Sequence, residues 1–353
     1  MIEILKGAIQ QGASDIHIKA GDYIRARIQG QLVPITKQQV PPEQTRQLAQ
    51  QLVPEWERGN IDKLRDYDCS WGARGVGRFR VNIFRQRGTM GIIMRVIPME
   101  VPTLDELELP SVLAEVAENN RGMVLVTGVT GSGKSTTLAA MLNHINEHVS
   151  QHILTLEDPI EFLHRDKKAS ITQREIGTDT QSFNVGLRAA LREDPDTILV
   201  GEMRDTETID IALKAAETGH LVFSTLHTQN AVKTLNRIIA VFPPEEQEMV
   251  RVRLAESILA VISQRLLPRK DGSGRIAAVE VMIATATIRD LILDPERTDE
   301  IMDLIADGRD RYRSQTFDQH LTDLVVEDIV DFEMAKAAAT NPGDFELRMR
   351  TLA

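Results

Sequence analysis

The sequence has 353 residues, 42% hydrophobic and 26% charged, which is the composition of a folded chain with room for two or three domains. A net charge of −11 and an aromatic content of 4% disfavour a nucleic-acid motor such as a helicase or recombinase, since those need basic surfaces and stacking side chains. No apolar run approaches the ~20 residues that span a bilayer, and the first residues lack the pattern of a secretion signal, so we expect a cytoplasmic protein.

The first hundred residues predict a compact α/β domain, placed at residues 1–98. Ile2, Leu5, Ala8 and Ile9 share one helix face, and Gly12 ends that helix. Alternation of polar and apolar residues predicts the strands. The expected strands are residues 15–19, 23–28, 68–71, 77–84 and 89–97, and the further helices are residues 43–52 and 56–64.

A proline-rich acidic stretch, residues 99–110, predicts a linker. After it strands and helices alternate, which predicts a mostly parallel sheet flanked by helices. The expected strands are residues 123–127, 153–156, 198–200 and 221–226, with helices from residue 134 and near residues 183–192 and 208–217. From Pro244 onward we expect a largely helical chain, interrupted by a strand at residues 276–282. The single cysteine, Cys69, excludes an internal disulfide and a multi-cysteine zinc site.

The stretch VTGVTGSGKSTT, residues 126–137, lies between an apolar strand and a helical pattern. It fits the P-loop pattern G-x-x-x-x-G-K-[ST] at every position, in which backbone amides surround phosphate oxygens. Lys134 can reach the β- and γ-phosphates, and the Ser135 hydroxyl can ligate Mg²⁺. A glycine-rich turn without a ligand is the alternative, which the flanking strand and helix disfavour. The predicted ATP-binding residues are Gly128, Thr130, Gly131, Ser132, Gly133, Lys134, Ser135 and Thr136.

Two acidic segments follow predicted strands of the same sheet, TLEDPIEF at residues 155–162 and ILVGEMRD at residues 198–205. Loops at the carboxyl ends of parallel strands line one crevice, so these carboxylates are expected near the P-loop. A carboxylate there can hold the metal or orient and deprotonate water. Ordinary solvated loop residues are the alternative for either segment.

The segment ETGHLVFSTLHT, residues 217–228, places His220 and His227 at the two ends of an apolar strand. Beside the P-loop strand, both are candidates for sensing the γ-phosphate, and structural roles are the alternative. A zinc site is disfavoured because no second ligand pair has suitable spacing.

Arginines gather in the strands before the linker, where alternation can place several of them on one face. They form either a solvated basic face or arginine fingers that reach a bound nucleotide. They are Arg74, Arg78, Arg80, Arg85, Arg87 and Arg95.

These motifs, in this order, resemble the type IV pilus retraction ATPase (PilT) family of the secretion ATPase superfamily over nearly the whole chain. The resemblance begins at GASDIH, residues 12–17, and continues through RFRVN, residues 78–82, and QRG, residues 86–88. Further boxes resemble the family's Asp box, its atypical Walker B and its His box, and all three are more specific than the P-loop. They are residues 157–161, 196–205 and 218–228.

The resemblance implies a PAS-like N-terminal domain and a RecA-like ATPase domain with C-terminal helices, residues 111–353, assembled as a homohexamer. It implies that Glu202 is the general base or positions water, that Glu161 supports metal and water, and that His220 and His227 contact phosphate or relay its loss. Gly201 stands where many P-loop proteins carry a magnesium-binding Asp. The expected metal residues are therefore Ser135, Glu157 and Asp158, and the expected nucleotide-binding arginines are Arg78, Arg80 and Arg95.

The implied function is an ATP-driven, Mg²⁺-dependent motor that depolymerises a pilus and powers twitching motility. The implied partners are an inner-membrane platform protein and, as the indirect load, pilin, with no nucleic acid. The implied location is the cytoplasmic face of the inner membrane.

One motif departs from the family pattern. Retraction motors typically carry AIRNLI near the C-terminal region, and this chain has TIRDLI at residues 287–292, with Thr287 and Asp290 in place of Ala and Asn. Its apolar residues share one helix face, and Arg289 lies off that face, where it can contact a partner or a neighbouring element.

Other functions remain as alternatives. The chain lacks the four-cysteine zinc element of many extension and secretion motors, which favours retraction over pilus assembly or type II secretion. The altered motif leaves an accessory retraction ATPase open. A nucleic-acid motor is disfavoured by the acidic charge, and a non-hydrolysing adaptor is disfavoured because the expected catalytic carboxylates are present.

Overall fold

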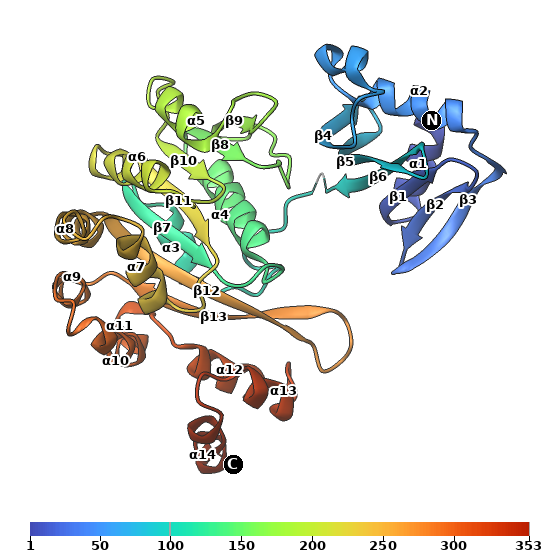
Figure 1. Cartoon of the computed structure of the whole chain (residues 1–353). Coiled ribbons are helices and arrows are strands. Elements are labelled where there is room, and N and C mark those ends of the chain that lie inside the picture. Colours follow the sequence, from blue (N-terminus) through green and yellow to red (C-terminus); the bar gives the residue numbers. More distant parts are fainter. Residues whose placement is uncertain (99, 353) are drawn as a thin grey trace. The chain divides into compact units, whose positions relative to one another are not determined.

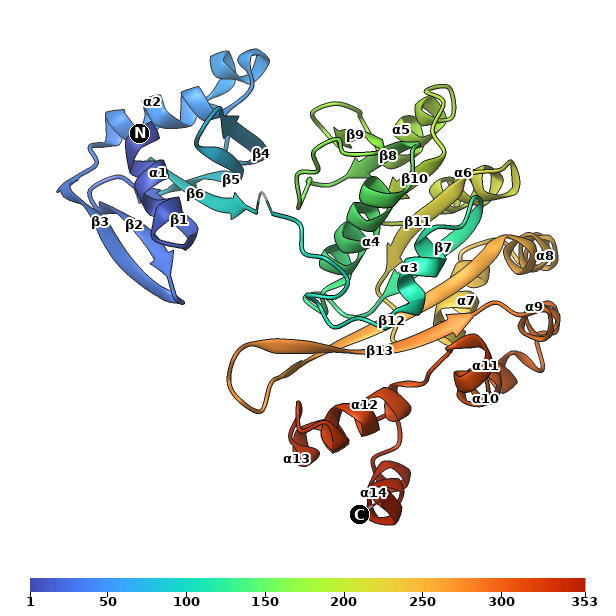
Figure 2. The same ribbon diagram turned by 180° about the vertical axis from the view of Figure 1, so that it is seen from behind.

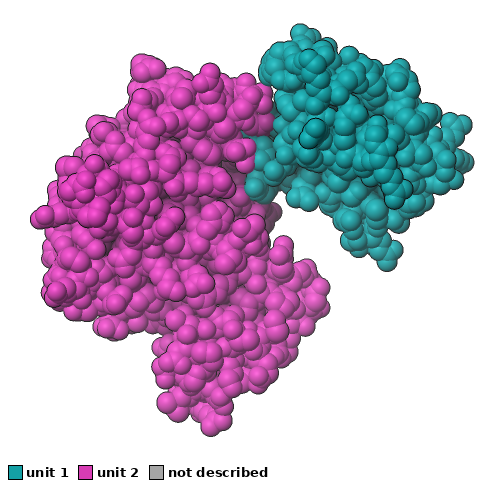
Figure 3. All heavy atoms as spheres, in the orientation of Figure 1, with its two compact units in different colours: residues 1–100, 159–163 teal, residues 101–158, 164–353 magenta. Residues whose placement is uncertain are grey.

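The structure is a computed structural model that describes residues 1–98 and 100–352. The chain divides into two compact units, Met1–Glu100 with Pro159–Leu163, and Val101–Asp158 with His164–Ala353 (Figures 1 and 3). Each unit contains its own sheet, so the fold is mixed α/β with two sheets. Residue 99, where the predicted linker starts, and Ala353, where the predicted ATPase domain ends, lie outside the described residues.

The first unit holds a six-stranded antiparallel sheet in the order β3-β2-β1-β6-β5-β4. Side chains on one face, among them Ile16 and Phe79, are buried with residues of α1 and α2. This alternation of buried and outward residues is why most of these strands could be predicted. The elements are α1 (Ile2–Gln10), β1 (Ala13–Lys19), β2 (Tyr23–Ile28), β3 (Gln31–Gln39), α2 (Pro42–Leu52), η1 (Glu55–Asn60), β4 (Asp66–Ala73), β5 (Gly77–Gln86) and β6 (Thr89–Ile97).

The opposite face of this sheet carries a row of charged side chains. Asp15 is in register with Arg27 on β2 and with Arg95 on β6, and Arg95 is in register with Arg80 on β5. The Arg95 Nε donates to Asp15 Oδ1 at 2.9 Å. Burial raises the pKa of Asp15, but hydrogen bonds from Arg95 and Ser14 outweigh this effect and hold the pKa below its usual value. The prediction that several of the arginines share one face is confirmed.

The second unit holds a seven-stranded sheet in the order β13-β12-β7-β11-β10-β8-β9. Neighbouring strands are parallel except in the β12–β13 hairpin, so the mostly parallel sheet predicted from the alternating elements is confirmed. The strands are β7 (Gly122–Thr127), β8 (His152–Glu157), β9 (Ser170–Glu175), β10 (Thr197–Val200), β11 (Leu221–Leu226), β12 (Ile258–Pro268) and β13 (Arg275–Ile283).

Helices cover both faces of this sheet (Figure 2). Along β7, Met123 and Leu125 pack with α5 to α10, whereas Val124 and Val126 pack with α3 and α4. None of the helices in the described residues combines the length and apolarity that crossing a bilayer requires. The helices are α3 (Val112–Ala117), α4 (Lys134–His148), α5 (Phe183–Ala190), α6 (Thr206–Glu217), α7 (Ala231–Ala240), α8 (Gln247–Ser257), α9 (Ala286–Leu293), η2 (Thr298–Glu300), α10 (Ile301–Asp307), α11 (Arg309–Tyr312), α12 (Phe317–Val326), α13 (Phe332–Ala338) and α14 (Pro342–Leu352).

The C-terminal segment closes the outer edge of β13. The backbone of Gln315 pairs with that of Val281 in both directions, at 2.8 and 3.0 Å, and its side chain donates to the Val279 carbonyl at 3.0 Å. His320 Nδ1 accepts the Val279 N–H at 2.9 Å. Beyond this contact, α12, α13 and α14 share a small apolar core with the hairpin (Figure 1).

His320 makes the stability of this segment depend on pH. Burial lowers the pKa of His320, and the Val279 contact requires a neutral ring at Nδ1. A histidine whose pKa is lowered by folding contributes stability that is present above its unfolded value of about 6.5 and is lost as the pH falls. We therefore expect His320→Asn, which keeps an acceptor near the Nδ1 position, to lose less stability than wild type between pH 7 and pH 5. Thermal unfolding measures this, and equal losses in both proteins would contradict the assignment.

Several elements differ from the prediction, among them the helices α3 and α7, which were not predicted. The segment expected to be helical after Pro244 contains the long strand β12, whose residues 258–262 form one apolar run because both faces of the sheet are covered. Such a run has no strand periodicity and cannot be told from a buried helix. The strands β3 and β9 were not predicted, and the helix expected at residues 56–64 is the short 3₁₀ helix η1.

Candidate functional site

The P-loop connects the end of β7 to the start of α4. Gly128 has a φ of +143°, and a Cβ there would lie 2.5 Å from Ser132 Oγ and 2.6 Å from the Gln264 carbonyl oxygen. Only glycine fits this position, because any larger residue would collide with a neighbouring backbone. Gly131 and Gly133 also have positive φ values, +80° and +93°, which turn the loop into the helix.

Polar groups of the P-loop are arranged as a phosphate site requires. The Lys134 ammonium is largely buried and donates to the carbonyls of Gly128 at 2.9 Å and Val129 at 3.1 Å, so it lies at the mouth of the loop. Ser132 Oγ is buried with no hydrogen-bond partner among the described residues. Ser135 and Thr136 follow in the first turn of α4, where the N–H groups and the helix dipole favour an anion. These features fit a nucleotide polyphosphate.

Glu202 and His227 meet at the carboxyl ends of the adjacent strands β10 and β11. The Thr225 hydroxyl donates to the Gly201 carbonyl at 2.6 Å, which joins the two strand ends. His227 Nε2 lies 3.7 Å from Glu202 Oε2, and Arg204 Nε lies 2.8 Å from the same oxygen. The Glu202 side chain is 20% exposed and that of Arg204 is 74% exposed, so the carboxylate is the more sheltered group. A sheltered carboxylate beside a histidine can orient water or accept its proton.

Glu157 ends β8 at the same edge of the sheet. Its Oε1 accepts from the Thr155 hydroxyl at 2.7 Å and from Gln173 Nε2 at 3.0 Å. Asp158 follows and is exposed. No group of three or more His, Cys, Asp or Glu side chains in the described residues is placed to hold a metal alone. Glu157 and Asp158 supply carboxylates at the strand end, and carboxylates are the side chains that Mg²⁺ usually binds together with substrate phosphates and water.

His220 lies at the opposite edge of the sheet. It precedes β11, and its carbonyl accepts from the N–H of Gly122 at the amino end of β7, whereas the P-loop follows the carboxyl end of β7. Its Nδ1 lies 2.9 Å from the Ala215 carbonyl, at the end of α6. Within one chain the strand separates His220 from the P-loop by its full length of ~20 Å. The structure therefore does not bring His220 to the phosphate site with His227.

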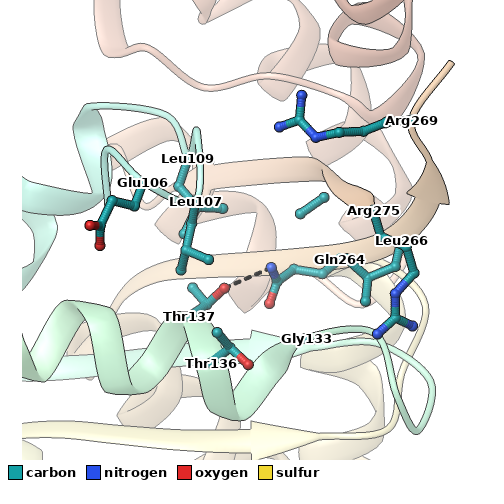
Figure 4. A pocket seen from close by; sticks show the side chains of 11 residues that line it. Glu106, Leu107, Leu109, Gly133, Thr136, Thr137, Gln264, Leu266, Arg269 and Arg275 are labelled. Carbon is teal, nitrogen blue, oxygen red and sulfur yellow. Dashed lines mark hydrogen bonds between the residues drawn. The ribbon is translucent and has the colours of Figure 1, made fainter. Parts of the chain in front are cut away.

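A pocket of about 300 Å³ opens beside the start of α4 (Figure 4). The Gln264 side chain reaches across it and donates to Thr137 Oγ1 at 2.8 Å. Gln264 is 2% exposed, and its Oε1 has no hydrogen-bond partner among the described residues. The pocket lies directly beside the P-loop residue Gly133 and beside Thr136 of the first turn of α4. Its walls are Glu106, Leu107, Leu109, Gly133, Thr136, Thr137, Gln264, Leu266, Arg269, Arg275 and Ala277.

A family model described as type II/IV secretion system protein matches residues 1–340. The chain belongs to this family. It is 46% identical to the type IV pilus retraction ATPase PilT of Pseudomonas aeruginosa, over 97% of this chain and 99% of the relative. It is 39% identical to the type IV pilus ATPase PilU of the same organism, over 99% of this chain and 91% of the relative. The crystal structure of the pilus retraction motor PilT with bound ADP covers 98% of each chain with a TM-score of 0.89 and 44% identity.

Several predicted site residues of this type II/IV secretion system protein lie in the first unit. Arg78 and Arg80 are on β5 and Arg95 is on β6, and Glu161 lies within Pro159–Leu163. The P-loop, Glu157, Asp158, Glu202 and His227 lie in the second unit. The role of the first-unit residues at the nucleotide stays a prediction.

The altered motif, residues 287–292, lies in α9. An arginine of each helix donates hydrogen bonds to the other helix, and these bonds join α9 to α8. Ile288, Leu291 and Ile292 are 1%, 3% and 0% exposed in the core. Arg289 donates to the carbonyls of Ala255 and, at 2.8 Å, Glu256, where α8 ends.

Arg251 of α8 in turn donates to the Ile292 carbonyl at 3.0 Å. Arg289 therefore contacts a neighbouring element, which was one of its two predicted roles.

Arg204 and Gln264 are among the site residues that were not predicted. Arg204 could have been found from its spacing to Glu202, since both leave the same strand. Gln264 lies on β12, and the only signal was a Ser263–Gln264 pair inside an apolar run. A polar pair in such a run indicates a buried group with a partner.

Proposed function

We propose that the chain is an ATP-hydrolysing motor that powers the retraction of type IV pili. The observation that carries this proposal is the 46% identity to PilT over 97% of the chain, together with an intact P-loop and the Glu202–His227 pair. Pilin depolymerisation and twitching motility are the expected outputs. A pilus-assembly or type II secretion role is disfavoured by the single cysteine and by the full-length match to a retraction motor.

In this proposal each residue has a defined role at the nucleotide. Lys134 and the P-loop amides bind the phosphates of ATP. Ser135, Glu157 and Asp158 hold Mg²⁺, which neutralises phosphate charge when bound. Glu202 orients the attacking water and accepts its proton, and His227 hydrogen-bonds to the same carboxylate or to the γ-phosphate.

The base and ribose of the nucleotide occupy the pocket beside α4. The pocket adjoins Gly133 and Thr136, so a nucleotide with phosphates in the P-loop extends directly into it. Leu266 and Leu109 supply apolar contacts for a base, and Arg269 and Arg275 supply cationic groups at the rim.

The assembly follows the family pattern. We propose a PAS-like first domain, a RecA-like ATPase domain and a homohexameric ring, in which Arg78, Arg80, Arg95 and Glu161 complete the nucleotide site. The ring works at the cytoplasmic face of the inner membrane on a platform protein, with pilin as the indirect load and no nucleic acid bound. His220, at the far edge of the sheet from its own P-loop, acts in the contact between subunits or in relaying phosphate loss.

Deletion of the gene tests the proposal. We expect a deletion strain to carry excess surface pili and to lose twitching motility, because pili extend without being withdrawn. Electron microscopy of surface pili and a motility assay measure the two outcomes. Absent pili would instead assign the chain to assembly.

An accessory retraction role is the second candidate, since Thr287 and Asp290 depart from the retraction motif. In that case the deletion strain would still retract its pili, but with less force. Retraction force measured with an optical trap separates the two.

A further inference from the structure

A buried carboxylate lies outside the residues assigned above. Glu280 is on β13 and is 0% exposed. Its Oε1 accepts the N–H of Ala231 at 2.8 Å, and its Oε2 has no hydrogen-bond partner among the described residues. Burying a carboxylate with an unsatisfied oxygen is costly, so a role beyond packing is indicated.

Glu280 lies at the end of the sheet that carries the P-loop and His227. In register, Glu280 pairs with Ser263 and Ser263 pairs with Thr127. Thr127 pairs in turn with Leu226. Thr127 immediately precedes the P-loop, and Leu226 immediately precedes His227. The Thr127 hydroxyl donates to Ser263 Oγ at 3.0 Å, so a row of polar side chains crosses three strands inside the core.

The partner of Glu280 is the first residue of α7, which begins just after the His box. Asn230 caps this helix by accepting the Lys233 N–H at 2.8 Å. The Glu280 carboxylate satisfies a second N–H of the first turn, and its negative charge is favoured by the positive end of the helix. The short segment that enters this turn carries His227, 3.7 Å from Glu202.

We propose that Glu280 is a positioning residue for ATP hydrolysis, whose carboxylate fixes the first turn of α7 and thereby holds His227 beside Glu202. This inference rests on the proposed ATPase activity. It assigns a function to a residue of the β12–β13 hairpin that lies two strands away from the P-loop strand.

The charge of Glu280 acts on activity and stability in opposite directions. Burial raises the pKa of Glu280 to about 7, against the opposing effects of the Ala231 N–H, the Arg265 guanidinium and the Ser263 hydroxyl. Among the described residues, the charged side chains that act on it are Arg265 from β12, which favours the ionised form, and Asp318 from α12, which disfavours it. An acid whose pKa is raised by folding destabilises the fold as the pH rises through that pKa. The ionised form that best holds α7 is therefore also the form that costs stability.

Glu280→Gln tests the proposal, because glutamine keeps the shape and an acceptor oxygen but cannot be charged. A charge-assisted hydrogen bond is about twice as strong as a neutral one, so the ratio of wild-type to variant turnover should rise about five- to tenfold from pH 6 to pH 8. The thermal midpoint of the variant should exceed that of wild type at pH 8, and the difference should shrink towards pH 5. Glu300→Gln, which removes an exposed carboxylate from η2, is the matched control and should change neither quantity.

Hydrogen exchange of the wild-type chain provides a measurement without a variant. After correction for intrinsic rates, the peptide spanning residues 229–235 should exchange faster at pH 6 than at pH 8. If wild type does not hydrolyse ATP, the proposed function fails. If it does, the inference is overturned by a turnover ratio independent of pH, by a variant less stable than wild type at pH 8, or by equal exchange at the two pH values.

Discussion

A chain carrying Glu202→Gln is expected to bind ATP normally and to hydrolyse it roughly 10²–10⁴-fold more slowly, the usual effect of losing a general base. The carboxylate lies at the carboxyl end of β10, within 3.7 Å of His227 and 2.8 Å of Arg204. Glutamine keeps the size and can still accept a hydrogen bond from Arg204, so the site should keep its shape. Only the ability to accept a proton from water is lost. Phosphate release at saturating MgATP, measured beside nucleotide affinity, checks both parts.

Two further variants define what this result means. Lys134→Ala removes the ammonium at the mouth of the P-loop and should weaken nucleotide binding itself. Glu207→Gln removes an exposed carboxylate of the neighbouring helix α6, which pairs with Arg188 and Asn184 away from the P-loop, and should leave turnover unchanged. Wild-type turnover in the Glu202 variant would remove Glu202 from the catalytic role.

Arg289→Ala is expected to abolish twitching motility while leaving basal ATP hydrolysis nearly intact. Arg289 of α9 donates to carbonyls at the end of α8, and Arg251 of α8 donates to a carbonyl at the end of α9. These hydrogen bonds join the two helices and do not involve the P-loop. Hydrogen bonds from charged groups are worth about 1.5–3 kcal/mol each, so the loss should loosen α9 without unfolding the sheet. Motility plates and ATPase assays on the same variant test this.

The reciprocal contact supplies a matched experiment. Arg251→Ala removes the bond to the Ile292 carbonyl and should give the same separation of motility from hydrolysis. Arg297→Ala, which removes an exposed arginine paired with Glu300 on η2, should have no effect on either. Normal motility in the Arg289 variant, or a parallel loss of ATPase activity, would show that α8 and α9 do not transmit the output of the motor.

Local patterns were sufficient to predict the P-loop and its surroundings. The spacing of the glycines and Lys134 after an apolar strand is enough to identify the P-loop. The proximity of Glu202 to His227 follows from the order of the strands in a parallel sheet. Most strands of the first unit could also be predicted from the sequence, because one side of that sheet is buried and the other carries charged residues such as Asp15 and Arg95.

Features that depend on pairing between distant strands could not be predicted in the same way. The run Ile258–Ile262 is apolar on both faces, so its strand β12 was mistaken for helix, and Gln264 was missed with it. Glu280 lies on the strand predicted at residues 276–282, but only the pairing of β13 with β12 brings it level with the P-loop. His220 was grouped with His227 because both flank one strand, but the two ends of a strand lie at opposite edges of a sheet. A sequence shows that two residues bracket a strand, and only the sheet shows which edge faces the site.

The outer edge of β13 is also where one copy of the chain would otherwise pair with another. A nine-residue strand with mostly apolar side chains offers free N–H and C=O groups to any strand that approaches it. Gln315 and His320 already use those groups at Val279 and Val281. A chain shortened before residue 315 would present this edge bare, and intermolecular sheet growth and aggregation would compete with folding. The C-terminal helices thus protect the solubility of the motor as well as completing its core.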